Sequence, residues 1–500
     1  MVQRTQKLRH LPAVILLLFS STASAGPFRF AGHDARSLGK AGPEALFGEG
    51  LGALYGNPAL LVDVPKELTA TFFFVQPLLS ADLMARPPNA DVPMTLYDSD
   101  VGIAGINLDR PLPTVELPRA RHSNRVDGTS TYLGVGFATD LNRDDFCLAL
   151  QLLVPTRGLV SVSSIFSDER DQFFSNTVHF ALFGEWSQVL SLLMGAAWRP
   201  VPWFSFGAAV EGSLDVGADL NMYIPEATVQ DYALVNTDIE ARPSGRAILG
   251  LNFRPLEWLS LSLVWRDRRL SRVDANAELA LWNYHEPGNE TRPKRVHQHH
   301  VLDLDYEPME ATLAAGAAFG DFTAGLSVTW NHWAEYLDTH HQRPQRAAVL
   351  QPTSPNDEDS RFAFSDTFSI QFSGAWRYGD GLSATLGAAF HPTPVPAQVG
   401  RTNYLDQDKL AFALGHRYDF RLWDIRWRVE ASLQFWRMFE ARVHKDPTLI
   451  KDEFPDDART LIGGEPMPEA AGLQTNNPGF PGFSFGGYAF MGAVSVGGMF

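Results

Sequence analysis

Along the stretch from Leu422 to Gln434, apolar and polar residues alternate. The apolar positions lie two residues apart, at Trp423, Ile425, Trp427, Val429, Ala431 and Leu433. Because a β-strand sends successive side chains to opposite faces, this stretch predicts a strand with one apolar face and one charged face. It is about 13 residues long, against about 5 or 6 for an average strand. A tilted strand of this length crosses the apolar core of a membrane, so we predict a transmembrane barrel strand.

The same alternation returns in other segments of the chain, at 146–154, 204–220, 246–254, 259–266 and 367–378. Strands that face lipid cannot end at an open sheet edge, because each unpaired backbone group would cost several kcal/mol there. The sheet must therefore close on itself. Counting the alternating segments predicts an all-β fold, a transmembrane antiparallel β-barrel of about 14 strands.

Residues 1–25 have the three parts of a secretory signal peptide. Positive residues come first, an apolar core follows at 11–19, and small residues at 23–25 suit a cleavage site. The mature chain is then expected to begin at Gly26. No later stretch approaches the roughly 20 continuous apolar residues of a transmembrane helix, which argues against a helical membrane protein. Secretion and a barrel together predict the outer membrane of a Gram-negative bacterium.

The average composition is similar to that of a soluble protein, with 45% hydrophobic residues and a mean hydropathy of -0.12. A barrel produces such an average because only alternate residues of each strand meet lipid. The net charge of -16 argues against nucleic acid as a partner. Tryptophans near the ends of expected strands suit girdles at the membrane interfaces, at Trp198, Trp203, Trp282, Trp330 and Trp333.

Residues 26–66 differ from the rest of the chain, because glycines and short apolar runs replace the long alternation. A barrel of more than about a dozen strands leaves a wide lumen, so we expect this N-terminal segment to be a small hatch that plugs it. Residues 67–500 would then form the barrel. Four stretches are too polar or too rich in proline to span lipid and are expected as long loops, at 81–130, 284–308, 340–360 and 445–483.

The hatch segment carries the motifs that relate this chain to a known family. Residues 37–42 read Ser-Leu-Gly-Lys-Ala-Gly, and residues 53–61 read Ala-Leu-Tyr-Gly-Asn-Pro-Ala-Leu-Leu. In this order, between a signal peptide and a first barrel strand, they resemble the N-terminal hatch of the FadL-type outer-membrane transporters of long-chain fatty acids and hydrocarbons. The resemblance implies that the hatch shifts when ligand arrives. It also implies a gating role for the corner formed by Gly56, Asn57, Pro58 and Ala59.

The residue types at this corner have a local physical reason. Pro58 fixes its own φ and lacks an amide donor, the Asn57 side chain can bind nearby backbone, and Ala59 allows close packing against the barrel wall. The same three residues also fit a helix N-cap at Asn57 with proline at the first helical position. Both interpretations are compatible with a hatch.

The C-terminus resembles the end of an outer-membrane barrel. Tyr488, Phe490 and the terminal Phe500 lie on one face of an expected final strand. Outer-membrane barrels typically finish on an aromatic residue, and this end resembles the signal that their insertion machinery reads. We therefore expect that machinery and the outer-membrane lipids among the partners of this chain.

Two arginines are candidates to meet a ligand carboxylate. Arg426 and Arg428 face the lumen if the alternation of their strand holds. Acidic residues flank them, at Asp424 and Glu430. A structural ladder of charges is therefore the alternative interpretation. Only their expected position in the lumen suggests that the two arginines bind a ligand.

No arrangement of residues identifies an enzyme. The chain lacks a Gly-x-Ser-x-Gly elbow and a phosphate-binding loop, and its serines and histidines form no recognisable triad. The closely spaced His297, His299 and His300 match no metal signature, so exposed loop histidines are the expected interpretation. We expect no catalytic site, no metal and no cofactor.

Barrel, hatch and resemblance together predict a channel for the passive uptake of hydrophobic molecules such as long-chain fatty acids. Aromatic hydrocarbons or other lipids are alternative ligands for the same fold. A nonspecific porin and a structural barrel with long acidic loops are alternative functions. Burial of apolar groups, at about 0.8 kcal/mol per CH₂, would supply the affinity without a coupled energy source. We expect the protein to be a monomer.

Overall fold

The computed structural model describes the chain from residue 28 to residue 500 with several gaps. The expected signal peptide, the expected loop 340–360 and most of the expected loop 81–130 lie outside the described residues. The described residues are 28–87, 90, 124–126, 129–156, 179–180, 190–213, 217–226, 231–241, 244–286, 289–336, 364–400, 402–450, 452, 471–473, 475, 477 and 479–500.

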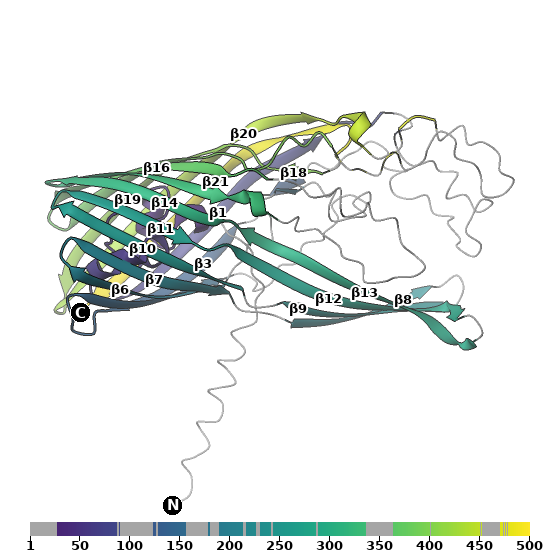
Figure 1. Cartoon of the computed structure of the whole chain (residues 1–500), viewed down its shortest axis with the longest axis horizontal. Helices are drawn as coiled ribbons and strands as arrows, with labels where there is room; N and C mark the ends of the chain where they lie inside the picture. The colour runs from purple at the N-terminus through teal and green to yellow at the C-terminus, as the bar shows by residue number, and fades with distance from the viewer. Residues whose placement is uncertain are drawn as a thin grey trace, which may run out of the picture.

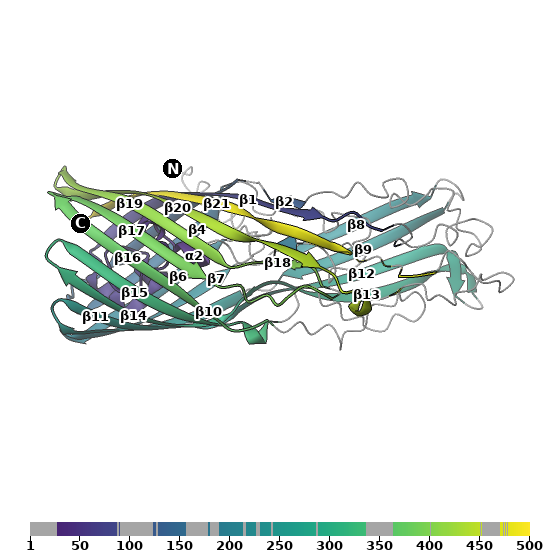
Figure 2. The same ribbon diagram turned by 90° about the horizontal axis from the view of Figure 1, so that it is seen from above.

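The dominant element is a barrel of antiparallel strands (Figures 1 and 2). Its wall strands are β1 Glu67–Leu83, β3 Ser130–Thr139, β4 Phe146–Pro155, β6 Ser191–Val201, β7 Phe204–Ser213, β10 Ser244–Leu256, β11 Leu259–Arg266, β14 Met309–Phe319, β15 Phe322–His332, β16 Thr367–Gly379, β17 Leu382–His391, β19 Lys409–Leu422, β20 Ile425–His444 and β21 Gly482–Met499. The barrel closes because β1 pairs with β21 on one side and with β3 on the other. Within the described part of the chain the wall has 14 strands, which confirms the predicted fold class.

The two ends of the barrel differ. Turns of a few residues join the strands at one end, close to the C-terminus, and longer connections join them at the other end (Figure 1). We call these the short-turn end and the long-loop end. In outer-membrane barrels the short turns are periplasmic and the long loops are extracellular.

Side chains alternate across the wall as the sequence predicts. In β20, Leu433 is 56% exposed on the outside, whereas Glu430 and Gln434 are buried on the inside. Trp198 and Trp203 are exposed near strand ends at the short-turn end, as an interfacial girdle requires. The side chain of Trp282 lies outside the described part.

Trp333 does not belong to such a girdle. It lies in the short helix η4 (Trp333–Glu335), directly after β15, and it is buried. Trp330, three residues earlier, is half-buried and donates from Nε1 to Asp366 at 3.1 Å. A tryptophan near a strand end can thus turn inward once the chain has left the strand, because the alternation no longer fixes its direction.

The strand expected from Leu422 begins later, at Ile425. Trp423 and Asp424 form the turn between β19 and β20, with φ angles of 52° and 60°. A two-residue hairpin turn commonly needs positive φ at both central residues, and aspartate tolerates this conformation better than most residues. The alternation runs through the turn without a break, so the pattern alone could not locate it.

The strand expected over 204–220 is divided. The wall strand β7 ends at Ser213, and the residues from Gly217 pair with other strands beyond the barrel. The alternation continues from β7 into the next strand, because a strand in water that packs on one face shows the same alternation as a strand in a membrane wall.

Four strands form a second sheet beyond the rim of the barrel, at the long-loop end (Figure 1). They are β8 Gly217–Glu226, β9 Asp231–Ala241, β12 Arg269–Glu286 and β13 Asn289–Glu307, in the order β13-β12-β9-β8. Residues 284–308, expected as a loop, are therefore mostly strand. Their polarity excludes them from lipid but does not exclude them from a sheet. The remaining short elements are β2 Asn124–Val126, β5 His179–Phe180, β18 Tyr404–Leu405 and η5 Pro447–Leu449.

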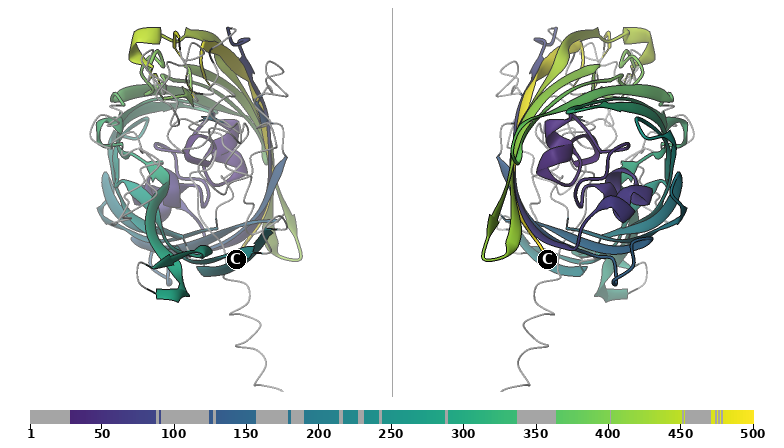
Figure 3. Two further views of the ribbon diagram at one scale, coloured as in Figure 1. Left: turned by 90° about the vertical axis from the view of Figure 1, so that its right-hand side faces the viewer. Right: turned by 90° about the vertical axis from the view of Figure 1, so that its left-hand side faces the viewer.

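The N-terminal segment lies inside the barrel (Figure 3). Its helices are α2 Phe28–Ala31, α3 Ala35–Gly39, α4 Ala53–Gly56 and η1 Pro58–Asp63. Asp34 caps α3, since its Oδ1 accepts a hydrogen bond from the amide of Ser37 at 2.7 Å. Leu38, Leu54 and Leu60 are buried as in a protein core. We call residues 28–63 the hatch.

Within the described residues, every helix is too short or too polar to cross a membrane.

A charge on the outer face at mid-height is expected to destabilise the barrel. Leu313 is 66% exposed near the middle of β14 and should face the centre of the lipid. We expect Leu313→Arg to lower the free energy of unfolding by about 2 to 4 kcal/mol, because arginine at the bilayer midplane costs that much. Urea titration of the protein folded in vesicles measures the change.

The matched control for this prediction is Phe319→Arg, on the same face of β14 at the short-turn end, where Phe319 is 64% exposed. Near the membrane interface the expected cost is about 0 to 1 kcal/mol. Equal costs for the two variants would contradict the placement of the membrane around this barrel.

Candidate functional site

The hatch connects two separate parts of the barrel wall. Helix α3 packs against β17, β19, β20 and β21, while η1 packs against β4, β6, β7 and β10. Figure 3 shows both parts of the hatch inside the lumen, viewed along the barrel. A movement that opens the lumen must therefore break contacts with the wall on at least one side.

Asn57 fastens the corner of the hatch to the wall. Its backbone is extended between α4 and η1, and its Oδ1 accepts a hydrogen bond from the amide of Ala59 at 3.1 Å. Pro58 is the first residue of η1, so the N-cap interpretation is confirmed. The Nδ2 group donates to the carbonyl oxygens of Ala45 (3.1 Å) and of Leu251 in β10 (3.3 Å). The side-chain amide of Asn57 thus caps η1 and connects it both to the hatch segment at Ala45 and to the wall strand β10.

Two glycines of the wall allow this close approach. A Cβ atom on Gly250 of β10 would lie 2.1 Å from Oδ1 of Asn57. A Cβ atom on Gly207 of β7 would lie 2.3 Å from the carbonyl carbon of Pro58. Real contacts are longer than this, so any larger residue at either position must displace the corner.

Buried arginines of the wall bind the hatch just before the corner. Arg266 of β11 donates to the carbonyl oxygens of Tyr55 (3.1 Å) and Gly56 (2.9 Å), and also to the Glu310 carboxylate (2.9 Å). Arg246 of β10 donates to the Tyr55 hydroxyl at 3.0 Å. Removing one partner of a buried ion pair leaves an uncompensated charge, at a cost of about 3 to 5 kcal/mol. These contacts therefore resist being broken one at a time.

His33 lies among these charged groups. Its ring centroid is 4.1 Å from that of Tyr55, and its Nε2 is 4.0 Å from Oε1 of Glu211. Burial lowers the pKa of His33 to about 4, and the negative charge of Glu211 offsets only part of this effect. His33 is therefore neutral in the folded protein at neutral pH.

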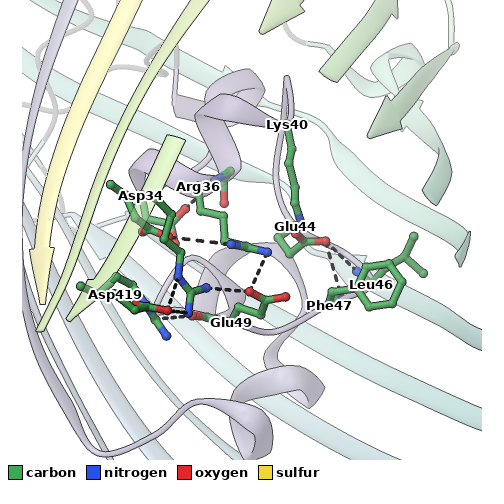
Figure 4. Close-up of polar contacts among 12 residues, drawn as sticks. Asp34, Arg36, Lys40, Glu44, Leu46, Phe47, Glu49 and Asp419 are labelled. Atoms are coloured by element: carbon green, nitrogen blue, oxygen red, sulfur yellow. Dashed lines mark hydrogen bonds and ion pairs between the residues drawn. The ribbon is translucent and has the colours of Figure 1, made fainter. Parts of the chain in front are cut away.

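Figure 4 shows the charged contacts of the other half of the hatch. Glu49 lies 2.7 Å from Arg36 of α3 and 2.7 Å from Arg417 of β19. Arg417 also pairs with Asp419 at 2.7 Å. Burial would raise the pKa of Glu49, but the positive charges of Arg36, Lys40 and Arg417 outweigh it and lower the pKa to about 2. Glu49 thus stays ionised and links the hatch to the wall.

Arg426 and Arg428 lie at the short-turn end, on the same side as these contacts. Arg426 is 54% exposed and 3.2 Å from Asp419. Arg428 is buried and donates to Asp419 and Glu67, each at 3.3 Å. The two arginines thus take part in ion pairs, as in a charge ladder, but with Asp419 and Glu67, whereas the sequence suggested Asp424 and Glu430 as partners. A role in binding a ligand carboxylate stays a prediction.

A small cavity lies between the hatch and the wall. Asp34 and Gly50 of the hatch line it together with Thr69, Gly136 and Gly497 of the wall. Its volume of about 10 Å³ accommodates roughly one water molecule. A hydrocarbon chain cannot pass through this space while the hatch keeps its described position.

Aromatic side chains gather at the long-loop end of the lumen, above the hatch. This aromatic cluster consists of Tyr306, Trp333, Tyr336, Phe364 and Tyr404. Tyr336 and Phe364 stack with ring centroids 4.1 Å apart. Arg29 of α2 lies 5.1 Å from the centroid of the Trp333 ring, so the hatch contacts the cluster from below.

The aromatic cluster could not be found from the order of the sequence. Its rings come from the end of β13, the residues after β15, the segment just before β16 and the short strand β18. Only Trp333 attracts attention in the sequence, and there it suggests a membrane girdle. The closure of the barrel brings the other rings to it.

The residues of the predicted insertion signal lie on the outside of the barrel. Tyr488, Phe490 and Phe500 are 41%, 44% and 71% exposed. The amide of Phe500 donates to the carbonyl of Lys66 at 3.1 Å, which ties the end of the chain to the start of β1. Recognition of these residues by the insertion machinery stays a prediction.

A methyl group at Gly250 is expected to dislodge the corner of the hatch. In Gly250→Ala the added Cβ would lie 2.1 Å from Oδ1 of Asn57, so this side chain must leave its hydrogen bonds. We expect hydrogen exchange of the η1 amides to become at least about tenfold faster, as for a loss of about 1.4 kcal/mol. The control is Gly212→Ala in β7, whose added Cβ meets no atom within 4 Å. Unchanged exchange in Gly250→Ala would contradict the described docking.

Acid is expected to destabilise the protein through His33. The pKa of this group is 6.5 when unperturbed and about 4 in the folded state. Between these pH values the unfolded chain binds the additional proton, so stability is full above pH 6.5 and falls as the pH falls towards 4. The expected loss is about 3 kcal/mol.

Thermal unfolding at pH 7, 5.5 and 4 measures this effect. His33→Asn should flatten the pH dependence, whereas His416→Asn, at an exposed position, should keep it. A His33→Asn variant that is as sensitive to acid as the parent protein would assign the effect to other groups.

Comparison with known proteins gives a match in structure alone. No family model and no curated protein matches the sequence. A FadL homologue of Pseudomonas aeruginosa matches with a TM-score of 0.55 at 16% identity, over 97% of this chain and 99% of that chain. The toluene transporter TodX of P. putida matches with a TM-score of 0.51 at 12% identity, over 94% of this chain and 99% of that chain. The resemblance seen in the hatch motifs is thus confirmed at the level of the fold, and the chain has the fold of the FadL-type transporters.

Proposed function

We propose that this chain is an outer-membrane channel for the passive uptake of hydrophobic molecules, with the hatch as its gate. The apolar outer belt suits a membrane, and the contrast between short turns and long connections suits the outer membrane. The two proteins of the same fold are described as a FadL homologue and a toluene transporter, which supports a hydrophobic cargo. That the protein works as a monomer stays a prediction.

The position of the aromatic cluster is the observation that carries this proposal. The cluster lies at the long-loop end, and its Trp333 touches Arg29 of the hatch. Aromatic rings offer large apolar contact areas, and a pair of rings gains about 0.5 to 1.5 kcal/mol beyond simple burial. A hydrophobic ligand arriving from outside would therefore bind next to the segment that must move.

A chain of buried contacts leads from this cluster to the corner. Arg29 donates to Glu310, and the other oxygen of Glu310 accepts from Arg266. Arg266 in turn holds the carbonyl of Gly56, next to Asn57. A ligand that displaces Arg29 would free one oxygen of Glu310, which would then compete with the carbonyl of Gly56 for the N–H groups of Arg266 and so weaken the anchoring of the corner. The narrow cavity beside the hatch supports the same conclusion, because a hydrocarbon chain does not fit through it unless the hatch moves.

The proposed ligands are long-chain fatty acids or aromatic hydrocarbons. Burial of each CH₂ group, at about 0.8 kcal/mol, favours a long chain. The stacked rings of the cluster favour an aromatic ligand. A fatty acid also needs a cation for its carboxylate, and the candidates Arg426 and Arg428 lie at the far end of the lumen in contact with Asp419. This distance between the aromatic cluster and the two arginines is the observation that supports aromatic hydrocarbons as a second candidate class beside fatty acids.

Transport by the purified protein tests the proposal. Proteoliposomes are expected to take up labelled toluene or oleate faster than empty liposomes do, while sucrose stays outside. The relative rates of toluene and oleate decide the ligand class. Sucrose flux equal to that of an open porin would contradict the proposal and favour the nonspecific porin.

The corner is tested with two variants of Asn57. Asn57→Ala loses the cap and leaves the carbonyls of Ala45 and Leu251 without this donor, at a cost of about 1 to 3 kcal/mol, and should impair uptake in a folded barrel. Asn57→Asp keeps an acceptor for the amide of Ala59 but loses the donor to the wall. We expect it to behave like Asn57→Ala if the wall contacts matter. Heat-modifiable migration in gels checks the barrel, and normal uptake by Asn57→Ala would remove the role of the corner.

A further inference from the structure

One buried hydroxyl of the aromatic cluster has no hydrogen-bond partner. Tyr306 is 5% exposed, and within the part of the chain that the structure describes its Oη atom meets neither a donor nor an acceptor. A polar group in this state lowers the stability of the folded protein, because water would satisfy it in the unfolded chain. Such groups are rare in native structures, so this hydroxyl points to a partner that arrives from outside.

The hydroxyl of Tyr306 keeps its proton at neutral pH. Burial raises the pKa of Tyr306 to about 12, and the negative charge of Glu335 acts in the same direction. The group therefore stays neutral and remains a hydrogen-bond donor. A molecule that brings an acceptor atom to Tyr306 would satisfy it.

The rings next to Tyr306 suit an aromatic molecule. The ring centroid of Tyr306 lies 5.4 Å from that of Tyr336, with the two rings edge to face at 82°. Tyr336 in turn stacks on Phe364. Tyr336 is only partly buried and lies in no strand, so it can move more easily than the rings below it. A ligand ring that replaces Tyr336 would stack on Phe364 and place a substituent close to Tyr306.

The cations near this position are already paired with carboxylates. Arg29 donates to Glu310, and Arg268 lies 2.9 Å from Glu335. A ligand carboxylate would have to compete with these acidic side chains and would add a negative charge beside them. A neutral carbonyl or ether oxygen requires only a donor, which Tyr306 supplies. The surroundings of Tyr306 therefore favour a neutral ligand.

We propose that the aromatic cluster prefers neutral aromatic molecules that carry a carbonyl or ether oxygen, and that the Tyr306 hydroxyl selects them by donating a hydrogen bond to this oxygen. The inference rests on the proposed function, in which this cluster receives the hydrophobic cargo, and it names the class of that cargo more closely. A site with a buried polar group discriminates between a ligand that pairs with the group and a ligand of the same shape that does not. A plain hydrocarbon would leave the hydroxyl unpaired.

Competition for uptake into proteoliposomes tests the proposal with two molecules of the same shape. Acetophenone has a carbonyl oxygen where α-methylstyrene has a CH₂ group. The measured quantity is the concentration of each compound that halves the uptake of labelled toluene by the full-length protein. Tyr306→Phe is expected to raise this concentration about tenfold for acetophenone, as for the loss of a hydrogen bond of about 1.4 kcal/mol, and to leave it unchanged for α-methylstyrene. Comparing the two proteins with one compound cancels the partition of that compound into lipid.

Two variants and a third compound are the controls. Tyr132→Phe removes the hydroxyl of a buried tyrosine in β3, outside the aromatic cluster, and should leave inhibition by both compounds unchanged. Phe364→Leu removes a ring of the cluster and should weaken inhibition by both compounds alike. Benzoate, which carries a carboxylate, should inhibit more weakly than acetophenone. Gel migration checks that each variant is folded.

Thermal unfolding without ligand supplies a second measurement. Because the Tyr306 hydroxyl has no partner among the described residues, Tyr306→Phe should unfold at the same temperature as the parent protein or at a higher one. A Tm lowered by several degrees would show that the hydroxyl is paired in the free protein, and would overturn the proposal.

The competition experiment separates the failure of this proposal from that of the channel function. Toluene uptake that acetophenone inhibits equally in the parent protein and in Tyr306→Phe would overturn the selection by Tyr306 and leave the channel function in place. Stronger inhibition by benzoate than by acetophenone would overturn the preference for a neutral ligand in the same way. Absence of toluene uptake by the parent protein, with oleate also excluded, would overturn both proposals.

Discussion

A peptide group without a hydrogen-bond partner is so costly in lipid that every strand of the wall needs a neighbour on each side. Here that requirement is met by β1, which pairs with β21 and with β3 and so joins the two ends of the sheet. Closure fixes which side of each strand faces out. It also creates a lumen, and a barrel of about this size leaves an open channel unless something fills it. Here the hatch lies inside the barrel and fills part of this lumen (Figure 3).

Buried charges, together with apolar packing, hold the hatch in place. On one side Arg266 binds the hatch carbonyls and Glu310, with both side chains about 5% exposed or less. On the other side Glu49 links Arg36 to Arg417 and is itself 36% exposed. Water weakens an exposed ion pair far more than a buried one. The ion pairs of Glu49 are therefore weaker attachments than the buried contacts of Arg266.

Much of the barrel was predictable, because alternation reports directly on which side of a strand a residue lies. The alternation did not predict where a strand ends, because apolar and polar residues continue to alternate beyond the strand end. It continues through the turn at Trp423, and it continues past Ser213 into the strands of the second sheet. Polarity correctly kept 284–308 out of the membrane wall but concealed a strand there. Asn57 was identified from its residue type, while its bond to Leu251 was not.

By itself the sequence determined a membrane barrel with a separate N-terminal segment and a capped corner at Asn57, because these features depend on local period and local backbone preference. Only the tertiary structure decided which distant residues meet. Arg29 reaches Glu310 across 281 positions of the chain, and His297 lies opposite Glu278. Contacts of this kind depend on strand register and on closure, which all the strands fix together and no single segment specifies.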